Sequence, residues 1–522
     1  PFSRSSFEYR RVVYSRASAI EDTTMPQRVV ITGWGQVTQR RNATPPFLDP
    51  VDMMERAARD AGALSGKGVW SLVDTILVVR TQSRVLDKPG EAIAARLGIQ
   101  PHTVRVSGIG GEVPQHFVNQ AAGMLSRGES KAVLICGAET YYPRDDTAVR
   151  GESALIQGIP DDYDADDAVG SDALEQRHGL SLPIHGFPLF ETALWGRSGL
   201  SLDDWLHQVG DLWSDFSAVA ARHPHAWTQE RVSTERIITI ADDNRPICFP
   251  YQKRMVSLVM ADLGSALVVT TEAHARSLRG GGATPVYFLG GAFAKDNQRF
   301  MVDKSSFTRS PALARVAQKA QERAGVAVAD LDGFDLYSCF PCAVNVARGE
   351  LGIAPDDPRP LTQTGGLGFF GGPGSNYALH GIASLAENIA AGKLDRGMAT
   401  ALGWFMHKYA AGIYGKSPTN ADLSGHDLMD LDNPGTGDGP VPRVEQAEGF
   451  GELETYTVIY ARDHSPRETL VYGRTDGGLR FVANCGSDDD TVARLTGDNQ
   501  IGARVRLTTD RTTGANRASF VD

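Results

Sequence analysis

The stretch Gly365-Gly-Leu-Gly-Phe-Phe-Gly-Gly-Pro-Gly374, followed by Ser375-Asn-Tyr-Ala-Leu-His-Gly-Ile, decides how this sequence folds. Glycine dominates the first ten residues, and glycine alone accepts positive φ and the close approach of another group without strain. Ser375 or Asn376 can cap a helix there. Apolar residues then recur at helical spacing: Leu379, Ile382, Ala386 and Ile389. The pattern predicts a crowded loop feeding a buried helix, the loop being either packed between two parts of a core or laid against a ligand.

An earlier segment repeats this organisation. Residues 110–137 read Gly-Gly, Pro, a helix, a glycine and a strand, and residues 371–403 read the same way. The elements upstream also correspond, as helices 51–62 and 311–324 and as strands 73–79 and 334–338. Two similar βα units predict a duplicated fold with a pseudo-twofold axis. The Gly110–Gly111 and Gly371–Gly372 turns are then expected to face each other at its centre.

Strands alternate with helices through both repeats, which predicts an α/β fold with a mostly parallel sheet. The first strand, 28–33, is expected to end at Gly33. The chain divides into five predicted segments: an expression tag or loose extension at 1–24, a first half at 25–280 with an insertion at 140–250, a second half at 281–420, a linker at 421–450 and a module at 451–522. Short alternating runs and turn signals make the last segment a small all-β barrel, most simply of OB type.

Composition limits the kinds of partner. The chain has 522 residues, a formal net charge of -11 and a pI near 5.6, which argue against nucleic acid or an anionic membrane surface. The sequence has no apolar run long enough to cross a bilayer. Five scattered cysteines suit a reducing compartment, so a cytoplasmic location is expected. Since the sequence has no second CxxC or HxxxH motif, no metal site is expected.

The insertion combines an acidic run at 161–167 with four tryptophans interleaved with histidines. The tryptophans are Trp195, Trp205, Trp213 and Trp227. Aromatic interleaving of this kind can stack an adenine ring, for which Trp227 is the candidate. Amphipathic helices that pack on the body produce the same pattern, and both interpretations stay open.

The duplicated halves, the insertion and the glycine loops together resemble the thiolase superfamily over residues 25–415. The similarity is greatest to the sterol-carrier-protein-like branch of acetyl-CoA acetyltransferases and to actinobacterial thiolase-like proteins. Four stretches carry it: 128–139, 262–266, Cys339-Phe340 and 365–373. The resemblance implies a five-layered αβαβα fold, CoA or acyl-CoA as ligand, and a monomer or homodimer. The tail resembles the small β-barrel of thiolase-like proteins, which implies a heteromeric partner as a further option.

The residues that carry thiolase chemistry are not at the matching positions. The first-half turn, 107–114, contains no cysteine to act as the nucleophile. The family's Gly-His-Pro histidine aligns with Gly372, and its Cys-x-Gly cysteine falls near residues 402–404. The segment that forms the family's oxyanion hole reads Tyr337-Ser338-Cys339-Phe340. The resemblance therefore implies a protein that binds CoA or acyl-CoA without the standard thiolase reaction.

The candidate ligand site follows from the resemblance and from the paired turns. Its adenine end is expected against the insertion and its thioester end at the turns. The candidate ligand-binding residues are Gly110, Gly111, Ser265, Gly371, Gly372, Pro373 and Trp227.

Two alternatives remain open. One is an active acyltransferase in which Cys339, at the start of a helix whose dipole lowers thiol pKa values, pairs with His380 or His407. Cys339 with Cys342 also forms a CxxC pair, a weak redox signal in this context. The other alternative is a non-catalytic partner subunit of an acyl-CoA enzyme.

Overall fold

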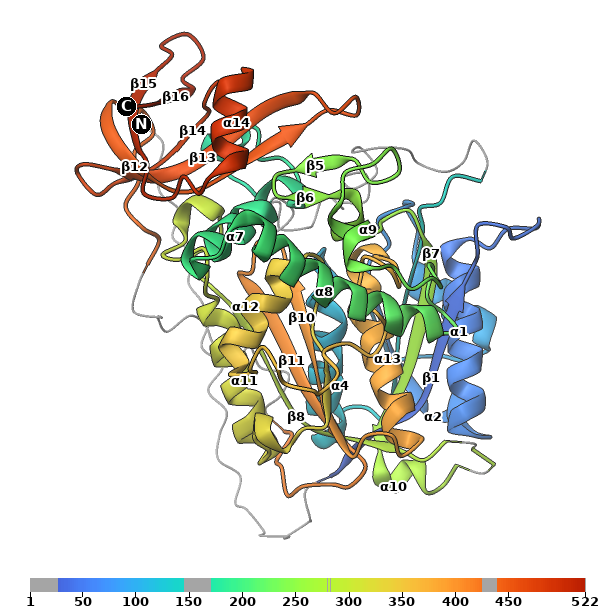
Figure 1. The fold of residues 1–522 in the computed structure, drawn as a ribbon. Coiled ribbons are helices and arrows are strands. Elements are labelled where there is room, and N and C mark those ends of the chain that lie inside the picture. The colour runs from blue at the N-terminus through green and yellow to red at the C-terminus, as the bar shows by residue number, and fades with distance from the viewer. Residues whose placement is uncertain (1–26, 145–169, 279, 282, 425–438, 522) are drawn as a thin grey trace, which may run out of the picture.

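The computed structural model describes residues 27–144, 170–278, 280–281, 283–424 and 439–521 (Figure 1). The predicted extension at 1–24 and the acidic run at 161–167 lie outside the described residues. No helix among the described residues is long and apolar enough to cross a membrane.

A nine-stranded mixed sheet forms the body, in the order β3-β2-β4-β7-β1-β8-β11-β10-β9. The prediction of a mostly parallel sheet is wrong, because β7 and β11 each run antiparallel to both of their neighbours and β1 pairs antiparallel with β8. From the central pair β1 and β8 outwards, the first half reads β1, β7, β4, β2 and the second half reads β8, β11, β10, β9. Corresponding strands therefore take corresponding places, which confirms the predicted duplication. The strands are β1 Val29–Thr38, β2 Val73–Val78, β3 Thr103–Val106, β4 Ala132–Thr140, β7 Asp262–Thr271, β8 Val286–Lys295, β9 Gly333–Asp335, β10 Arg396–Gly403 and β11 Lys408–Gly415.

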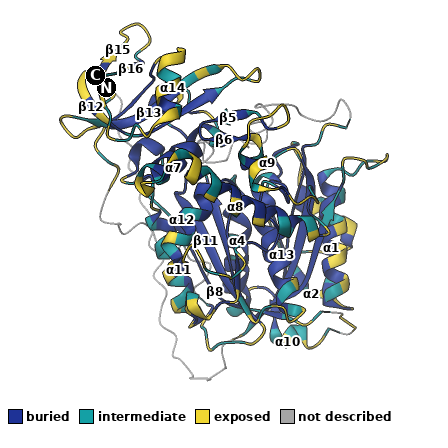
Figure 2. Cartoon of the chain, in the orientation of Figure 1, coloured by how far each residue is buried: buried dark blue, intermediate teal, exposed yellow. Residues whose placement is uncertain are grey.

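Helices cover both outer faces and fill the centre. The central helices α4 (Val113–Ser126) and α13 (Tyr377–Ala390) contact each other and strands of both halves (Figures 1 and 2). Both are buried along most of their length, as their apolar spacing predicts. The outer helices are α1 Pro50–Ser65 and α3 Pro89–Leu97 on the first half, and α11 Pro311–Ala324 and α12 Pro341–Leu351 on the second. This arrangement is the expected duplicated αβαβα fold.

Strand β1 runs to Thr38 and does not end at Gly33 as predicted. A Cβ added at Gly33 would lie 1.9 Å from the carbonyl oxygen of Ala61, and one at Gly35 would lie 2.0 Å from that of Ala57. These glycines bring α1 against the strand and do not end it, because the missing side chains allow close approach.

The insertion is mostly helical and lies across the body. Trp195, Trp205 and Trp213 are buried, and Trp205 Nε1 donates to Glu191 Oε1 over 3.0 Å. These three tryptophans therefore follow the packing interpretation. The described elements of the insertion are α6 Ala173–Arg177, α7 Pro183–Ser198, α8 Leu202–Arg222, α9 Thr234–Ile238, β5 Pro246–Cys248, β6 Tyr251–Gln252 and η2 Lys253–Met255.

The C-terminal module is an antiparallel sheet in the order β14-β13-β12-β15-β16, confirming the predicted all-β module. A bridge between Asn484 and Arg517 brings its two ends together. Its OB-type assignment stays a prediction. Its elements are β12 Gly449–Tyr460, β13 Pro466–Thr475, β14 Arg480–Ala483, α14 Asp489–Gly497, β15 Arg504–Thr509 and β16 Asn516–Phe520. The remaining short elements are α2 Val69–Leu72, α10 Glu272–Ala275, η3 Met301–Asp303, η4 Val328–Asp330 and η5 Gly374–Asn376.

The module is attached to the insertion by main-chain pairing and buried polar contacts. Strand β5 pairs with β12 through Cys248 and Ile459, so the insertion adds a strand to the module's sheet (Figure 1). The hydroxyl of Tyr472 donates to Glu175 Oε1 over 3.0 Å, and burial raises the pKa of Glu175 to about 8. The N–H of Asn516 donates to His178 Nε2 over 2.8 Å.

Candidate functional site

The two glycine turns meet at the N-terminal ends of the central helices. The main-chain N–H of Gly110 donates to Ser375 Oγ over 3.0 Å, and Gln82 Nε2 donates to the same oxygen over 2.8 Å. The first turn therefore contacts Ser375, the residue that follows the second glycine stretch, while the facing of Gly110–Gly111 and Gly371–Gly372 stays a prediction. Neither Ser375 nor Asn376 caps α13 with its side chain, because both side chains cross to the first half.

The residue at the start of each central helix lies against a glycine of the opposite half. Glu112 begins α4, and a Cβ added at Gly403 would lie 2.0 Å from Glu112 Oε2. Asn376 begins α13, and a Cβ added at Gly137 would lie 2.4 Å from Asn376 Oδ1. Each glycine lies on the strand that the sequence repeat makes equivalent, β10 or β4.

The partners of these two residues are equivalent as well. Lys408 is the cross-strand partner of Gly403, and Ser265 is the cross-strand partner of Gly137. Glu112 Oε1 lies 3.5 Å from Lys408 Nζ, with both side chains almost completely buried.

Asn376 takes the corresponding position in the other half with neutral contacts. Its Nδ2 donates to the carbonyl oxygen of Gly137 over 2.9 Å and to Ser265 Oγ over 3.2 Å. The pseudo-twofold axis therefore relates a buried ion pair in one half to a neutral hydrogen-bonded pair in the other.

Tyr337 covers the remaining glycine of the first turn. A Cβ added at Gly111 would lie 2.2 Å from Tyr337 Oη and 2.4 Å from the carbonyl oxygen of Leu402. Burial raises the pKa of Tyr337 well above its usual value, so its hydroxyl keeps its proton. The first-half turn, the 337–340 segment, the 402–403 segment and the second glycine turn thus converge on one point.

The place where these segments meet does not fit the thioester end of a CoA ligand, because side chains of the protein fill it. Tyr337 covers Gly111, and Glu112 covers Gly403. A Cβ added at Gly110 would lie 2.1 Å from Glu112 Oε2. The bare glycine backbone that a ligand would need is occupied by side chains of the chain itself, so we derive no reaction step through a bound thioester.

The loop 365–374 packs against the insertion. Gly365 (φ 100°) lies against Ala220 of α8, where a Cβ would come within 2.4 Å of the Ala220 Cβ. Gly371 (φ 115°) lies against Leu263, with 2.7 Å to its Cδ1. The loop therefore sits between two parts of the core, the first of the two alternatives from the sequence.

The last residues of the loop are less crowded. At Gly372 the nearest neighbour of an added Cβ, Leu367 Cδ2, would be 3.5 Å away. The carbonyl of Pro373 accepts from the N–H of Asn376 over 2.9 Å, which begins the turn into α13.

Trp227, the candidate adenine platform, is buried beside this loop. Its main-chain N–H donates to the carbonyl oxygen of Phe370 over 2.8 Å. The ring of Tyr142 lies 5.4 Å from its ring, and the Arg41 guanidinium lies 5.7 Å from its centroid. With 6% of its surface exposed, the ring presents no open face for an adenine.

Cys339 is buried, and burial raises the pKa of its thiol far above the usual value. The expected lowering by the helix dipole is therefore outweighed by desolvation. Its carbonyl oxygen accepts from Ser257 Oγ over 2.7 Å. Among the described residues, no hydrogen bond or ring contact joins Cys339 to His380 or to His407.

The two candidate histidines have separate surroundings. His380 Nδ1 lies 2.8 Å from Gln36 Oε1, and its ring lies 5.0 Å from that of Phe370. His407 follows β10, and its two ring nitrogens are buried without a hydrogen bond to any described residue. Burial lowers the pKa of both well below the usual value, so both imidazoles are neutral.

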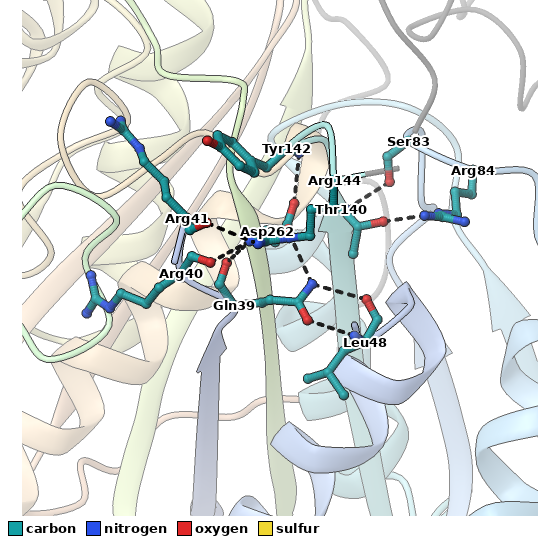
Figure 3. Close-up of polar contacts among 10 residues, drawn as sticks. All are labelled: Gln39, Arg40, Arg41, Leu48, Ser83, Arg84, Thr140, Tyr142, Arg144 and Asp262. Carbon is teal, nitrogen blue, oxygen red and sulfur yellow. Dashed lines mark hydrogen bonds and ion pairs between the residues drawn. The ribbon is translucent and has the colours of Figure 1, made fainter. Parts of the chain in front are cut away.

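Asp262 organises the strand ends beside the turns (Figure 3). Arg144 Nε donates to Asp262 Oδ2 over 2.7 Å, and Gln39 Nε2 donates to the same oxygen over 3.1 Å. The N–H of Tyr142 donates to Asp262 Oδ1 over 2.8 Å. This buried carboxylate therefore joins the ends of β1, β4 and β7.

Glu112, Lys408 and Arg144 were not among the residues singled out from the sequence. The available signal was a charge inside or beside an apolar element: Glu112 at the start of a buried helix and Lys408 in a strand of small and aromatic residues. Among the described residues, no group of three or more His, Cys, Asp or Glu side chains is arranged to hold a metal ion.

Three solved structures illustrate what this chain is similar to. The first is described as a monomeric SCP2-thiolase like protein type 1 from Mycobacterium smegmatis, with 31% identity, a TM-score of 0.78, and 95% of this chain and 99% of that chain covered. An Ltp2-ChsH2(DUF35) aldolase has 19% identity, a TM-score of 0.60 and coverages of 76% and 99%. An acetyl-CoA acetyltransferase from Syntrophomonas wolfei has 14% identity, a TM-score of 0.52 and coverages of 75% and 100%. The last two show similarity of fold alone.

A family described as the thiolase-like protein type 1 additional C-terminal domain matches residues 436–512. The comparison with curated proteins gives no match.

Proposed function

Since the chain belongs to the SCP2-thiolase-like protein type 1 family, we propose that it is a thiolase-fold protein that binds CoA or an acyl-CoA without thiolase chemistry. The observation that carries the proposal is the buried Glu112–Lys408 pair at the head of α4. The resemblance places the family's nucleophile in this turn, and a carboxylate that faces a lysine cannot form the thioester intermediate of a thiolase.

The protonation state of the Cys339 thiol supports the same conclusion. Acyl transfer needs a thiolate, and burial holds the pKa of Cys339 far above neutral pH. A neutral buried thiol without an imidazole partner is a poor nucleophile. The geometry therefore favours a binding role over turnover.

The ligand is proposed to lie along the insertion and to stop short of the paired turns, because the chain's own side chains cover Gly110, Gly111 and Gly403. The parts of a CoA molecule that remain outside the turns are its nucleotide and pantetheine arm. In this proposal the residues of the chain bind the CoA ligand and prevent acyl transfer at the turns.

Calorimetric titration of the full chain with CoA and with acetyl-CoA tests the proposal, with chromatography of the mixture after incubation. We expect saturable binding and no loss of thioester. Thioester cleavage that disappears in Cys339→Ala would instead establish the acyltransferase alternative. Serine is the better second variant, because Cys339→Ser keeps the side-chain volume in a packed site.

A heteromeric role is the second candidate, favoured by the similarity in fold to an Ltp2-ChsH2(DUF35) aldolase, whose name joins two components. The partner is expected to contact the C-terminal module. Absence of CoA binding, together with a stable complex between this chain and an acyl-CoA enzyme in size-exclusion chromatography with light scattering, would favour this candidate over the first.

A further inference from the structure

A cavity of about 440 Å³ opens at the carboxyl end of β1, between α1 and the segment that follows α8. Its walls carry three arginines, Arg40, Arg56 and Arg59, together with His225, and Asp60 is the acidic residue among them. This concentration of cationic side chains stands out in a chain whose formal net charge is -11. The cavity does not use the paired glycine turns.

Arg40 enters this cavity without a carboxylate partner among the described residues. Its Nη1 donates to the carbonyl oxygen of Ala226 over 2.5 Å and to that of Trp227 over 3.5 Å, and its Nη2 donates to that of Pro224 over 2.6 Å. A guanidinium carries five N–H donors, so these neutral carbonyls leave donors and the full positive charge unmatched. Partial burial lowers the pKa of Arg40, because desolvation disfavours the charged guanidinium.

The position of Arg40 is fixed by the Asp262 cluster. Arg144 Nη2 donates to the main-chain carbonyl of Arg40 over 2.6 Å, and Arg144 is itself held by Asp262. Figure 3 shows the Arg40 side chain extending away from this cluster. Arg144 thus holds the main chain of Arg40, while the carbonyls of Pro224 and Ala226 hold its guanidinium, and this preorganisation lowers the entropic cost of binding.

The opposite wall, on α1, supplies a second unpaired guanidinium. Arg59 is neutralised by Glu55, which accepts from its Nε over 2.8 Å. Arg56 is exposed and forms no hydrogen bond or ion pair among the described residues. Burial raises the pKa of nearby Asp60, and the charge of Arg56 only partly opposes that rise. Arg40 and Arg56 thus present two cationic forks to one cavity from two different elements.

Gln36, one of the lining residues, belongs to a buried polar network. Gln36 lines the cavity, and its Oε1 lies 2.8 Å from His380 Nδ1, while its Nε2 donates to Ser384 Oγ over 3.1 Å. His223 Nε2 lies 3.0 Å from the same hydroxyl. Because both polar atoms of the Gln36 amide have partners, the arginines are the groups left to bind a ligand.

We propose that this cavity binds a small anion through phosphoryl or carboxyl oxygens, held between the guanidiniums of Arg40 and Arg56. Planar guanidinium groups bind both oxyanions with paired, charge-assisted hydrogen bonds. Neither arginine lies at the paired turns, and the probes used below contain no CoA, so the site is tested separately from the proposed CoA function.

Calorimetric titration of the full chain with inorganic phosphate and, separately, with succinate tests the proposal at low ionic strength. We expect saturable binding of at least one of the two, weakened on the order of tenfold by Arg56→Ala and further by Arg40→Ala with Arg56→Ala. The better-bound probe identifies the oxyanion group. Added sodium chloride should weaken binding, because the site is open to solvent.

Arg511→Ala is the matched control, since Arg511 is an exposed arginine of the C-terminal module that forms no ion pair among the described residues. This variant should bind as the unchanged chain does. Arg56 is exposed, so Arg56→Ala should fold even where Arg40→Ala, which loses its main-chain contacts, does not. Absence of saturable binding for both probes, or equal weakening in Arg511→Ala and Arg56→Ala, would overturn the proposal.

Discussion

The heads of the two central helices occupy equivalent places but have different chemistry. At the head of α13, Asn376 makes neutral hydrogen bonds to Gly137 and Ser265. At the head of α4, Glu112 faces Lys408 in a buried ion pair. The backbone register is the same in both, so the difference lies in the side chains alone. A twofold scaffold can therefore keep its geometry while one half changes the chemistry at its centre.

The largest effect is expected from breaking the ion pair. Glu112→Ala removes the carboxylate that faces the buried Lys408 ammonium, and loss of one partner of a buried pair costs about 3–5 kcal/mol. The free energy of unfolding from urea titration measures this cost. The double variant Glu112→Leu with Lys408→Met is the control, because removal of both charges should recover most of the loss. A double variant as unstable as the single one would show that the pair is not the cause.

The second prediction concerns pH. Glu139 accepts N–H groups from Gln82 and Ser83 beneath the second turn, and burial raises its pKa from 4.5 to about 7. The folded chain therefore holds this proton more tightly than the unfolded chain does. Its contribution is fully present below pH 4.5 and is lost as the pH rises to about 7, by roughly 3 kcal/mol in the free energy of unfolding.

Other buried carboxyls titrate in the same range, so the test is a difference between two chains. Burial raises the pKa of Glu191 to about 7 and that of Asp335 to about 6. Urea unfolding of the unchanged chain and of Glu139→Gln at several pH values isolates the Glu139 part. The variant should show a shallower loss of stability between pH 4.5 and 7. If the free energy of unfolding fell with pH equally in both chains, Glu139 would not be the titrating group.

A third prediction concerns the crowding around Gly111 in the first turn. Gly111→Ala places its Cβ 2.4 Å from a main-chain carbonyl that cannot move aside easily, and overpacking of this kind costs up to about 3 kcal/mol. The thermal midpoint and the urea midpoint should both fall. Tyr337→Phe with Gly111→Ala should recover only part of the loss, because the Leu402 carbonyl stays in place.

Asn376→Ala should have a smaller effect than Glu112→Ala. It removes two neutral hydrogen bonds and leaves the Gly137 carbonyl without its donor, at a cost of about 2 kcal/mol. Urea titration under the conditions used for Glu112→Ala gives the comparison directly. If Asn376→Ala were less stable than Glu112→Ala, the neutral contacts of α13 would contribute more stability than the ion pair of α4, contrary to this prediction.

The smallest effect is expected at Gly372, in the second glycine turn. Its Cβ would find its nearest neighbour 3.5 Å away, an ordinary contact, so Gly372→Ala should change the free energy of unfolding by no more than about 0.5 kcal/mol. A large loss would mean that the backbone of this turn needs glycine for a reason other than space.

The duplication was predictable from the sequence because its signals are local. Helical spacing, turn glycines and strand runs recur in both repeats, and each depends only on neighbouring residues. The extent of β1 beyond Gly33 is not predictable in this way, for the opposite reason. Whether a glycine ends a strand or admits a helix depends on Ala57 and Ala61, which are far along the chain.

The sequence predicted the location of the candidate site but not the side-chain contacts and pKa values that decide its chemistry. The repeat located the point where the turns meet, while Glu112 and Lys408 come together only across the axis. The thiol of Cys339 shows the same limit, because sequence indicates its helix start but not the burial that raises its pKa. The unpaired charge of Arg40 likewise depends on the main-chain carbonyls of the insertion.

Strand β5 has a consequence for synthesis on the ribosome. Cys248 pairs with Ile459, so a strand of the insertion waits for a partner that is made much later. At about 5–20 residues per second, the delay is on the order of ten seconds or more. Throughout that time the nascent chain carries an open strand edge, a site for unwanted pairing. Early release or truncation of the last module would make that exposure permanent.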